Sequence, residues 1–231
     1  MAAIKLPERI KLVSWDVDGT LYSIRRMKWH VMRRFLVEMI RGRGLKARKE
    51  LSALQSYRDR VNDARSSGGA LNKFFVDQNS REDLLEIEKR WYGPAIQKTG
   101  PREGVANVMS FLGERGFLQV VISDYEAAYK LESLGLADRF AAIYVGERLG
   151  FVKPSPVGFQ RAVADFQTST TRLVHIGDRA DRDDAGARAA GCQCLILGRD
   201  FRSFAELLDL LQSRMSEMTD LTSAGEPDGA G

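Results

Sequence analysis

Cysteine is scarce in this sequence of 231 residues, which contains two cysteines, Cys192 and Cys194, and two histidines. Because a single residue separates the cysteines, they are too close to form an ordinary disulfide or a zinc site by themselves. Gln193 and the apolar residues 195–197 surround them, so we predict that both cysteines belong to a buried strand. Cysteine chemistry is therefore not expected to stabilise this fold.

Long hydrophobic runs are also missing, since no apolar stretch approaches the ~18 residues that a membrane-spanning helix needs. Residues 1–7 lack the apolar block of a secretion signal. We therefore expect a cytoplasmic protein with no membrane partner. The hydrophobic fraction of 44% and the charged fraction of 29% are typical of a globular protein with a sizeable core.

Acidic residues are under-represented in one segment. Residues 23–100 contain 18 Lys and Arg against nine Asp and Glu, a net charge of +9, while the remainder contains 17 and 22, a net charge of −5. This asymmetry indicates two bodies with different roles. The basic segment is interpreted either as a solvated surface or as a face that steers an anionic substrate. Nucleic acid is an unlikely partner, because no groove of interleaved basic and aromatic residues is present.

Outside the basic segment, hydrophobic periodicity alternates between short strands and amphipathic helices. Strands are predicted for residues 10–15, 118–122, 141–145, 172–176 and 193–197. The helices predicted between and after them cover residues 104–115, 126–134, 156–166, 183–190 and 203–215. This alternation predicts an α/β fold with a doubly wound, parallel, five-stranded, Rossmann-like sheet.

Residues 23–100 show only helical periodicity. Helices are predicted from residue 25 to 40, from 46 to 65 and from 72 to 76, with a further helix capped by Ser80 and closed by Gly93 and Pro94. We therefore predict an all-helical cap domain, residues 23–100, inserted into a core formed by residues 1–22 and 101–216. Residues 217–231, rich in Gly, Ser, Thr and Asp, are predicted to be a disordered tail.

Polar residues gather where the predicted strands end. They are Asp16, Asp18, Ser123, Asp124, Lys153, Asp178 and Asp183, with Gly19 beside the first two. Ligands of doubly wound sheets bind beyond the carboxyl ends of the strands, so these side chains are expected to meet. Asp16 and Asp18 repel each other and lose hydration unless a hard divalent cation neutralises them. A plain turn after the first strand is the alternative explanation of Asp-x-Asp-Gly.

The ordered set of motifs resembles the haloacid dehalogenase superfamily over about residues 9–200. The first motif is residues 16–20, the second contains Ser123, the third Lys153, and the fourth residues 177–183. The helical segment after the first motif is similar to that family's first-type cap. The resemblance implies the same fold and a phosphatase of this superfamily.

The resemblance also implies roles for these residues. Asp16 would be the nucleophile, and Asp18 would protonate the leaving oxygen and then activate water. A neighbouring carboxylate and the bound phosphate would raise the pKa of Asp18 for this purpose. The residues implied to bind the phosphate group are Ser123, Asp124, Lys153 and Gly19.

Mg²⁺ is the implied cofactor, and its implied ligands are Asp16, the carbonyl of Asp18, and Asp178. Asp183 would support the site from behind the ligands, with Asp184 as its rival. Many family members carry Asn where this chain has Asp124, which adds a charge near the phosphate. Asp181 is interpreted as the N-cap of the following helix.

The two histidines are given separate interpretations. His175, inside a predicted strand, is interpreted as a hydrogen-bonded core residue. His30, on the first helix of the basic segment, faces either the substrate or solvent.

The favoured function is a Mg²⁺-dependent phosphatase that hydrolyses a small, anionic, phosphorylated metabolite through a phospho-aspartate intermediate. A phosphosugar mutase of the same superfamily is the first alternative. The second is a non-catalytic module that binds a phospho-ligand or nucleic acid through its basic cap. The sequence does not determine the oligomeric state.

Overall fold

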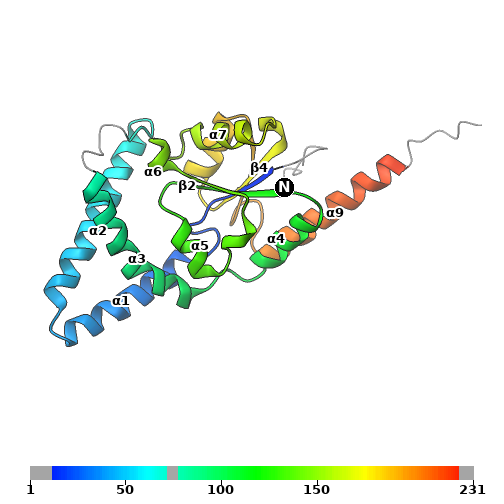
Figure 1. Ribbon diagram of the computed structural model, residues 1–231. Helices are drawn as coiled ribbons and strands as arrows, with labels where there is room; N and C mark the ends of the chain where they lie inside the picture. The colour runs from blue at the N-terminus through cyan, green and yellow to red at the C-terminus, as the bar shows by residue number, and fades with distance from the viewer. Residues whose placement is uncertain (1–11, 72–77, 224–231) are drawn as a thin grey trace, which may run out of the picture.

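A five-stranded parallel sheet organises the molecule (Figure 1). The computed structural model describes residues 12–71 and 78–223, with side chains for residues 12–71 and 81–215. The strands are β1 (Leu12–Trp15), β2 (Leu118–Ser123), β3 (Ala142–Val145), β4 (Leu173–Gly177) and β5 (Gln193–Ile196). Their order in the sheet is β3-β2-β1-β4-β5. The predicted doubly wound α/β fold is therefore confirmed, and β1 lies between β2 and β4.

Side chains alternate between the two faces of the sheet, and helices cover both faces. Val13 and Trp15 of β1 belong to one apolar cluster, and Leu12 belongs to the other. The first cluster contains residues of α4 (Val105–Glu114), α5 (Ala128–Leu134) and α9 (Phe204–Ser223). The second contains residues of α7 (Val157–Asp165) and α8 (Ala185–Ala189). A strand buried on both faces reads as a continuous apolar run, which is why the strands are recognisable in the sequence.

Three long helices lie between β1 and α4 in the chain, and Figure 1 shows them to one side of the sheet. They are α1 (Ile24–Ile40), α2 (Gly44–Ser66) and α3 (Gln78–Thr99). Ala47, Leu54 and Trp91 form their shared apolar centre. A further cluster joins Tyr57 and Val61 of α2 to Tyr125 and Val152 of the core. This second cluster places one end of α2 against the loops that follow β2 and β3.

The end of α3 differs from the prediction that Gly93 and Pro94 close it. The helix continues through Pro94 to Thr99. A proline inside a helix leaves the carbonyl four residues earlier without its N–H partner. Here that carbonyl, of Arg90, accepts a hydrogen bond from the guanidinium of Arg34 on α1. The packing of α1 against α3 thus supplies a hydrogen-bond donor for the Arg90 carbonyl, so α3 can continue past Pro94.

Other boundaries also differ. Ser80 lies inside α3 and does not begin it. Helix α9 runs to Ser223, so residues 217–223 are helical where a disordered tail was predicted. The predicted helix at 72–76, residues 10–11 of the first strand and the tail from 224 onward lie outside the described residues. The structure also contains a short helix, α6 (Gly146–Leu149), that was not predicted.

Membrane insertion finds no support among the helices. None in the described part of the chain is both long and apolar enough to span a bilayer.

Candidate active site

Asp16 stands at the centre of the sheet edge, directly after β1. Its backbone N–H donates to the carbonyl of Ile176 at 2.9 Å, which extends the pairing of β1 with β4 by one residue. Its side chain accepts from Lys153 Nζ at 2.7 Å on one oxygen and from Thr20 Oγ1 at 3.0 Å on the other. Asp16 is buried, so these two donors fix the orientation of its carboxylate.

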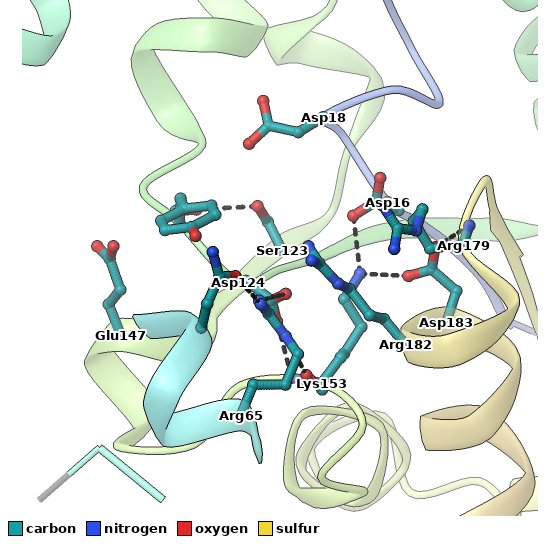
Figure 2. Close-up of polar contacts among 12 residues, drawn as sticks. Asp16, Asp18, Arg65, Ser123, Asp124, Glu147, Lys153, Arg179, Arg182 and Asp183 are labelled. Carbon is teal, nitrogen blue, oxygen red and sulfur yellow. Dashed lines mark hydrogen bonds and ion pairs between the residues drawn. The ribbon is translucent and has the colours of Figure 1, made fainter. Parts of the chain in front are cut away.

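Lys153 joins the first motif to the fourth. Its ammonium donates to Asp16 at 2.7 Å, to Asp183 at 2.6 Å and to the carbonyl of Ile122 at 3.1 Å. Figure 2 shows Lys153 between the two carboxylates. Burial disfavours this charge, but Asp16 and Asp183 outweigh burial and raise the pKa of Lys153. A charged lysine is therefore fixed beside Asp16.

Asp183 is held by donors on both of its oxygens. Besides Lys153, it accepts the backbone N–H groups of Asp178 at 3.1 Å and Arg179 at 2.9 Å, and His175 Nε2 lies 3.3 Å away. Burial opposes ionisation, but Lys153 and His175 hold the pKa of Asp183 well below its usual range. A carboxylate with this many protein partners orients its neighbours, which agrees with the supporting position predicted for it.

The rival acids point elsewhere. Asp184 pairs with Arg188 at 3.0 Å and with Arg199 at 2.9 Å, outside the cluster around Lys153. Asp181 was interpreted as an N-cap, but it lies within the turn η3 (Ala180–Asp184) and pairs with Arg179 at 2.9 Å. The five-residue spacing after Asp178 therefore identified the acid that contacts the site.

Asp178 is the carboxylate with the fewest protein partners. Its Oδ1 is buried without a hydrogen-bond partner. Burial first, and then the nearby Asp183, raise its pKa to about 6. Oxygen atoms of Asp16, Asp178 and Asp183 lie within 4.8 Å of one another. Three carboxylates face one lysine here, and burial also raises the pKa of Asp16 against the opposing effect of Lys153.

This cluster fits a hard divalent cation. All its donors are carboxylate oxygens, it carries an excess of negative charge, and one of its buried oxygens has no partner. Asp16 and Asp178 are the residues that would hold the ion, because each oxygen of Asp16 has one protein partner whereas each oxygen of Asp183 has two.

Gly19 allows the loop after β1 to pass close to Asp178. Its φ of +104° lies in the region that glycine tolerates best, and a Cβ at this position would overlap the Asp178 carboxylate. No other residue type fits here without displacing Asp178. Gly19 therefore shapes the acidic cluster, and its predicted contact with phosphate stays a prediction.

The side chain of Asp18 points away from Asp16 and Asp183 (Figure 2), and it has partners of its own. Lys130 Nζ donates to Oδ2 at 2.6 Å, and the hydroxyl of Tyr22 donates to Oδ1. Burial raises the pKa of Asp18, but Lys130 and Arg58 together outweigh burial and lower it. The pKa of Asp18 is thus lowered in the protein without phosphate, and the raised pKa expected with phosphate bound stays a prediction.

Lys130 was missed by the sequence analysis. It is fully buried on α5. A single lysine on an amphipathic helix is usually solvated, so the local pattern held no signal of its contact with Asp18.

Ser123 and Asp124 follow β2, and both already have protein partners. The Ser123 hydroxyl donates to the carbonyl of Tyr125 at 2.9 Å. Asp124 accepts the N–H of Lys153 at 2.7 Å on one oxygen and Arg65 Nη2 at 2.8 Å on the other. Arg65 also donates to the carbonyl of Lys153 at 2.8 Å (Figure 2). These contacts favour Asp124 as the residue that joins α2 to the core, rather than as a direct phosphate contact.

The interpretation of His175 is confirmed, whereas the prediction that both cysteines belong to a buried strand is correct for neither in full, because Cys192 lies outside the strand and Cys194 is only partly buried. His175 is fully buried, with Ser14 Oγ 2.8 Å from Nδ1, so it is a hydrogen-bonded core residue. Cys194 lies in β5 and Cys192 directly precedes the strand, and both are free thiols. His30 is partly exposed on α1.

Comparison with known proteins gives a consistent result. The family model of haloacid dehalogenase-like hydrolases matches residues 10–191. A glyceraldehyde 3-phosphate phosphatase from Methanopyrus kandleri is 28% identical over 193 residues, which cover 79% of this chain and 81% of the relative. A phosphoglycolate phosphatase from Neisseria meningitidis is 26% identical over 197 residues, covering 80% of this chain and 79% of that one.

Solved structures show the same fold. YfnB from Bacillus subtilis, a HAD-hydrolase bound to magnesium, superposes with a TM-score of 0.61 at 19% identity over 88% of this chain and 99% of that chain. A 2-haloacid dehalogenase from Pseudomonas syringae gives a TM-score of 0.57 at 24% identity over 89% and 99% of the two chains.

Proposed function

The chain belongs to the haloacid dehalogenase-like hydrolase family, and we propose that it is a Mg²⁺-dependent phosphatase that acts in the cytoplasm through a phospho-aspartate at Asp16. Phosphatases recur among its relatives, and it is a phosphoric monoester hydrolase. The observation that best supports this mechanism is that Lys153 donates hydrogen bonds to both Asp16 and Asp183 at the edge of the acidic cluster. Residues 23–100 are proposed to act as the cap.

In the first half of the reaction, the Asp16 carboxylate attacks phosphorus and the ester oxygen departs. Lys153 and Thr20 hold that carboxylate in a fixed orientation, so little entropy has to be lost to orient the nucleophile during the reaction. Asp18 gives its proton to the leaving oxygen, so the alcohol departs neutral. In the second half, Asp18 takes a proton from water as the water attacks the phospho-aspartate, which releases phosphate and regenerates Asp16.

The ionisation of Asp18 suits the second half directly. Lys130 and Tyr22 hold it as a carboxylate, which is the form that accepts a proton from water. The first half needs the acid form, and a phosphate dianion beside Asp18 would raise its pKa by charge repulsion. Binding of the substrate is thus proposed to favour the protonated form of Asp18, which is the form that the first half of the reaction needs.

Asp16 and Asp178, with the carbonyl of Asp18, are proposed to hold Mg²⁺. When bound, the ion would supply positive charge that offsets the repulsion between carboxylates and phosphate. Asp183 is proposed to hold this arrangement through the backbone of residues 178 and 179. Ser123 is proposed to turn its hydroxyl from Tyr125 toward a phosphoryl oxygen.

The substrate is proposed to be a small phosphorylated metabolite. Relatives that cover about four-fifths of the chain act on glyceraldehyde 3-phosphate and phosphoglycolate, which have two or three carbons.

Replacing Asp16 by Asn tests the mechanism. With Mg²⁺ present, Asp16→Asn should lose all measurable hydrolysis of p-nitrophenyl phosphate, whereas the exposed Asp138→Asn should retain it. Asp18→Asn should accumulate acid-stable phosphoenzyme after rapid quenching, because the second half then lacks its base. Activity retained in Asp16→Asn would refute the proposal, as would an isomerised product without released phosphate.

A further inference from the structure

Buried and partly buried polar and aromatic residues from both the core and the helical segment surround Asp18 on the side that faces away from the acidic cluster. They are Tyr22, Arg58, Glu88, Tyr92, Tyr125, Tyr129 and Lys130. In the proposed mechanism Asp18 protonates the leaving oxygen, so the rest of the leaving group lies on this side. We call these seven residues the leaving-group side.

Arg58 is a cationic residue of α2 that reaches this region. Its guanidinium lies over the ring of Tyr92 at 4.8 Å and over that of Tyr125 at 5.3 Å. Lys130 Nζ lies 5.6 Å from the same Tyr125 ring and 2.6 Å from Asp18. Contacts through one tyrosine therefore connect Arg58 with Asp18, and Arg58 is near enough to lower the pKa of that carboxyl.

The guanidinium of Arg58 is positioned but only loosely paired. Its nearest carboxylate oxygen is Glu88 Oε1 at 3.9 Å, and no hydrogen bond from Arg58 is found in the described part of the chain. Its side chain is 22% exposed, so it is partly accessible to solvent. Two aromatic rings lie against the guanidinium and do not accept hydrogen bonds from it in the plane of its N–H groups, which suits an anion receptor.

Two nearby arginines of the same segment behave differently. Arg65 donates to Asp124, to the carbonyl of Lys153 and to Asn62. Arg81 pairs with Glu147. Both are engaged in fixing the helical segment to the core, whereas Arg58 retains its donors beside the leaving-group side.

We propose that Arg58 determines substrate specificity by binding a carboxylate on the leaving group, so that the preferred substrates are phosphate esters of small hydroxy acids. This inference rests on the phosphatase function proposed above. A planar guanidinium and a planar carboxylate form two parallel hydrogen bonds, and a lysine or a hydroxyl cannot reproduce that pairing. A neutral leaving group of the same length would leave the Arg58 fork without this partner.

Matched substrates test the proposal on the full chain with Mg²⁺. Phosphoglycolate and 2-hydroxyethyl phosphate differ in having a carboxylate or a hydroxymethyl group at the far end. The wild-type enzyme should favour phosphoglycolate by at least about 30-fold in kcat/KM, the range expected of a charge-assisted bidentate pair. Arg58→Ala should lower kcat/KM for phosphoglycolate by about the same factor, chiefly through KM, because the lost bond is made before the chemical step.

The same variants separate recognition from folding. Arg58→Ala should lower kcat/KM for phosphoglycolate at least about tenfold more than for 2-hydroxyethyl phosphate, because both esters share its effect on Asp18 and only one of them carries a carboxylate. Arg58→Lys should recover part of the preference for phosphoglycolate. Arg60→Ala, an exposed position on α2, should change neither substrate. Equal losses on both substrates would mean that Arg58 only supports the structure, and would overturn the proposal.

Failure of this inference differs from failure of the phosphatase function. A wild-type enzyme that hydrolyses both esters equally well overturns the role of Arg58 and leaves the phosphatase function standing. A wild-type enzyme that hydrolyses neither ester nor p-nitrophenyl phosphate removes both proposals.

Discussion

At Gly19 the backbone takes a φ of +104° and passes against the Asp178 carboxylate. The glycine is required twice, once by the backbone angle and once by the lack of space for a Cβ. Gly42 provides a comparison, since its φ of +73° is also left-handed but nothing lies within 4 Å of a Cβ there. Comparing substitutions at Gly19 and Gly42 therefore distinguishes the effect of backbone strain from the effect of the close approach to Asp178.

Gly19→Ala should therefore cost more than Gly42→Ala. We expect Gly42→Ala to lower the free energy of unfolding by about 1–2 kcal/mol, the cost of a left-handed L-residue. Gly19→Ala should add a displacement of Asp178 and weaken Mg²⁺ binding at least about tenfold, or about 1.4 kcal/mol. Urea denaturation and Mg²⁺ titration calorimetry measure the two effects. Unchanged Mg²⁺ affinity in Gly19→Ala would contradict the proximity argument.

The raised pKa of Asp178 predicts that the proposed binding of Mg²⁺ depends on pH. Its pKa is raised to about 6 in the metal-free protein, so a proton competes with the ion below that value. We expect the dissociation constant for Mg²⁺ to rise about tenfold between pH 7 and pH 5, as the carboxylate becomes protonated. Asp178→Asn should bind weakly with a flatter pH profile, and Asp138→Asn should behave like wild type.

The effect of Asp178 on the stability of the metal-free protein has the opposite pH dependence to its effect on Mg²⁺ binding. Between its usual value near 3.8 and its folded pKa of about 6, the folded metal-free protein retains a proton that the unfolded chain has lost. The free energy of unfolding should therefore decrease as pH rises through this window. Added Mg²⁺ should reverse that trend, because it binds the ionised form.

At the scale of elements, α3 shows how one helix allows another to contain a proline. Pro94 removes the N–H that would pair with the carbonyl of Arg90, and Arg34 of α1 donates to that carbonyl instead. The guanidinium of Arg34 also lies 5.0 Å from the ring of Trp91. The geometry of α3 thus depends on its neighbour rather than on its own sequence.

A double-mutant cycle on Arg34 and Pro94 tests this dependence. Arg34→Ala alone should lower the free energy of unfolding by about 1 kcal/mol, since it leaves the Arg90 carbonyl without its protein donor. In a Pro94→Ala background the restored N–H pairs with that carbonyl, so Arg34→Ala should cost measurably less. Equal costs in both backgrounds, measured by urea denaturation, would show that Arg34 acts only through Trp91.

Helix α2 is fixed to the core through Arg65. Its side chain donates both to Asp124 at 2.8 Å and to the carbonyl of Lys153 at 2.8 Å, and it is 9% exposed. The second and third motifs therefore share one cation that comes from the helical segment. Loss of that cation leaves a nearly buried carboxylate without its charge partner.

Arg65→Ala should accordingly destabilise the protein by about 3 kcal/mol, the usual cost of breaking a buried ion pair from one side. The exposed Arg48→Ala on the same helix should cost little, within about 0.5 kcal/mol. Because Asp124 also accepts the N–H of Lys153, Arg65→Ala should lower kcat on p-nitrophenyl phosphate as well. A stable Arg65→Ala variant with wild-type kcat would refute the role assigned to this contact.

At the scale of the whole molecule, charge is divided between the two parts of the chain. Residues 23–100 carry a net charge of +9 and the remainder carries −5. We expect the helical segment to attract an anionic substrate that approaches the site, over a distance that becomes shorter as the salt concentration rises.

This division predicts a salt dependence of capture rather than of chemistry. Between about 20 mM and about 500 mM NaCl, kcat/KM for a phosphate ester should fall several-fold while kcat stays nearly constant. Replacing the exposed Arg25 and Lys28 of α1 by Glu should flatten this dependence. A salt effect confined to kcat would point to the site itself instead of long-range attraction.

Much of this architecture is readable from the chain. The strands are predicted to within one residue at most ends, because strands buried on both faces leave continuous apolar runs. Residues that follow such strands converge at one edge of a parallel sheet, so Asp16, Asp178 and Lys153 can be grouped from their places in the sequence alone. Their proposed roles remain to be tested by the variants above.

What the sequence by itself determined is thus the sheet, the family and the residues at the sheet edge, since each follows from local patterning or an ordered motif. Only the tertiary structure decided which long side chains from other elements complete the site. Lys130 beside Asp18, Arg65 on Asp124 and Arg58 over two tyrosine rings all depend on how α2 and α5 are rotated and docked. The packing of these helices depends on elements that are distant in the chain. The periodicity of a helix shows which face is apolar, but it does not show which residues the Lys and Arg side chains of that helix contact.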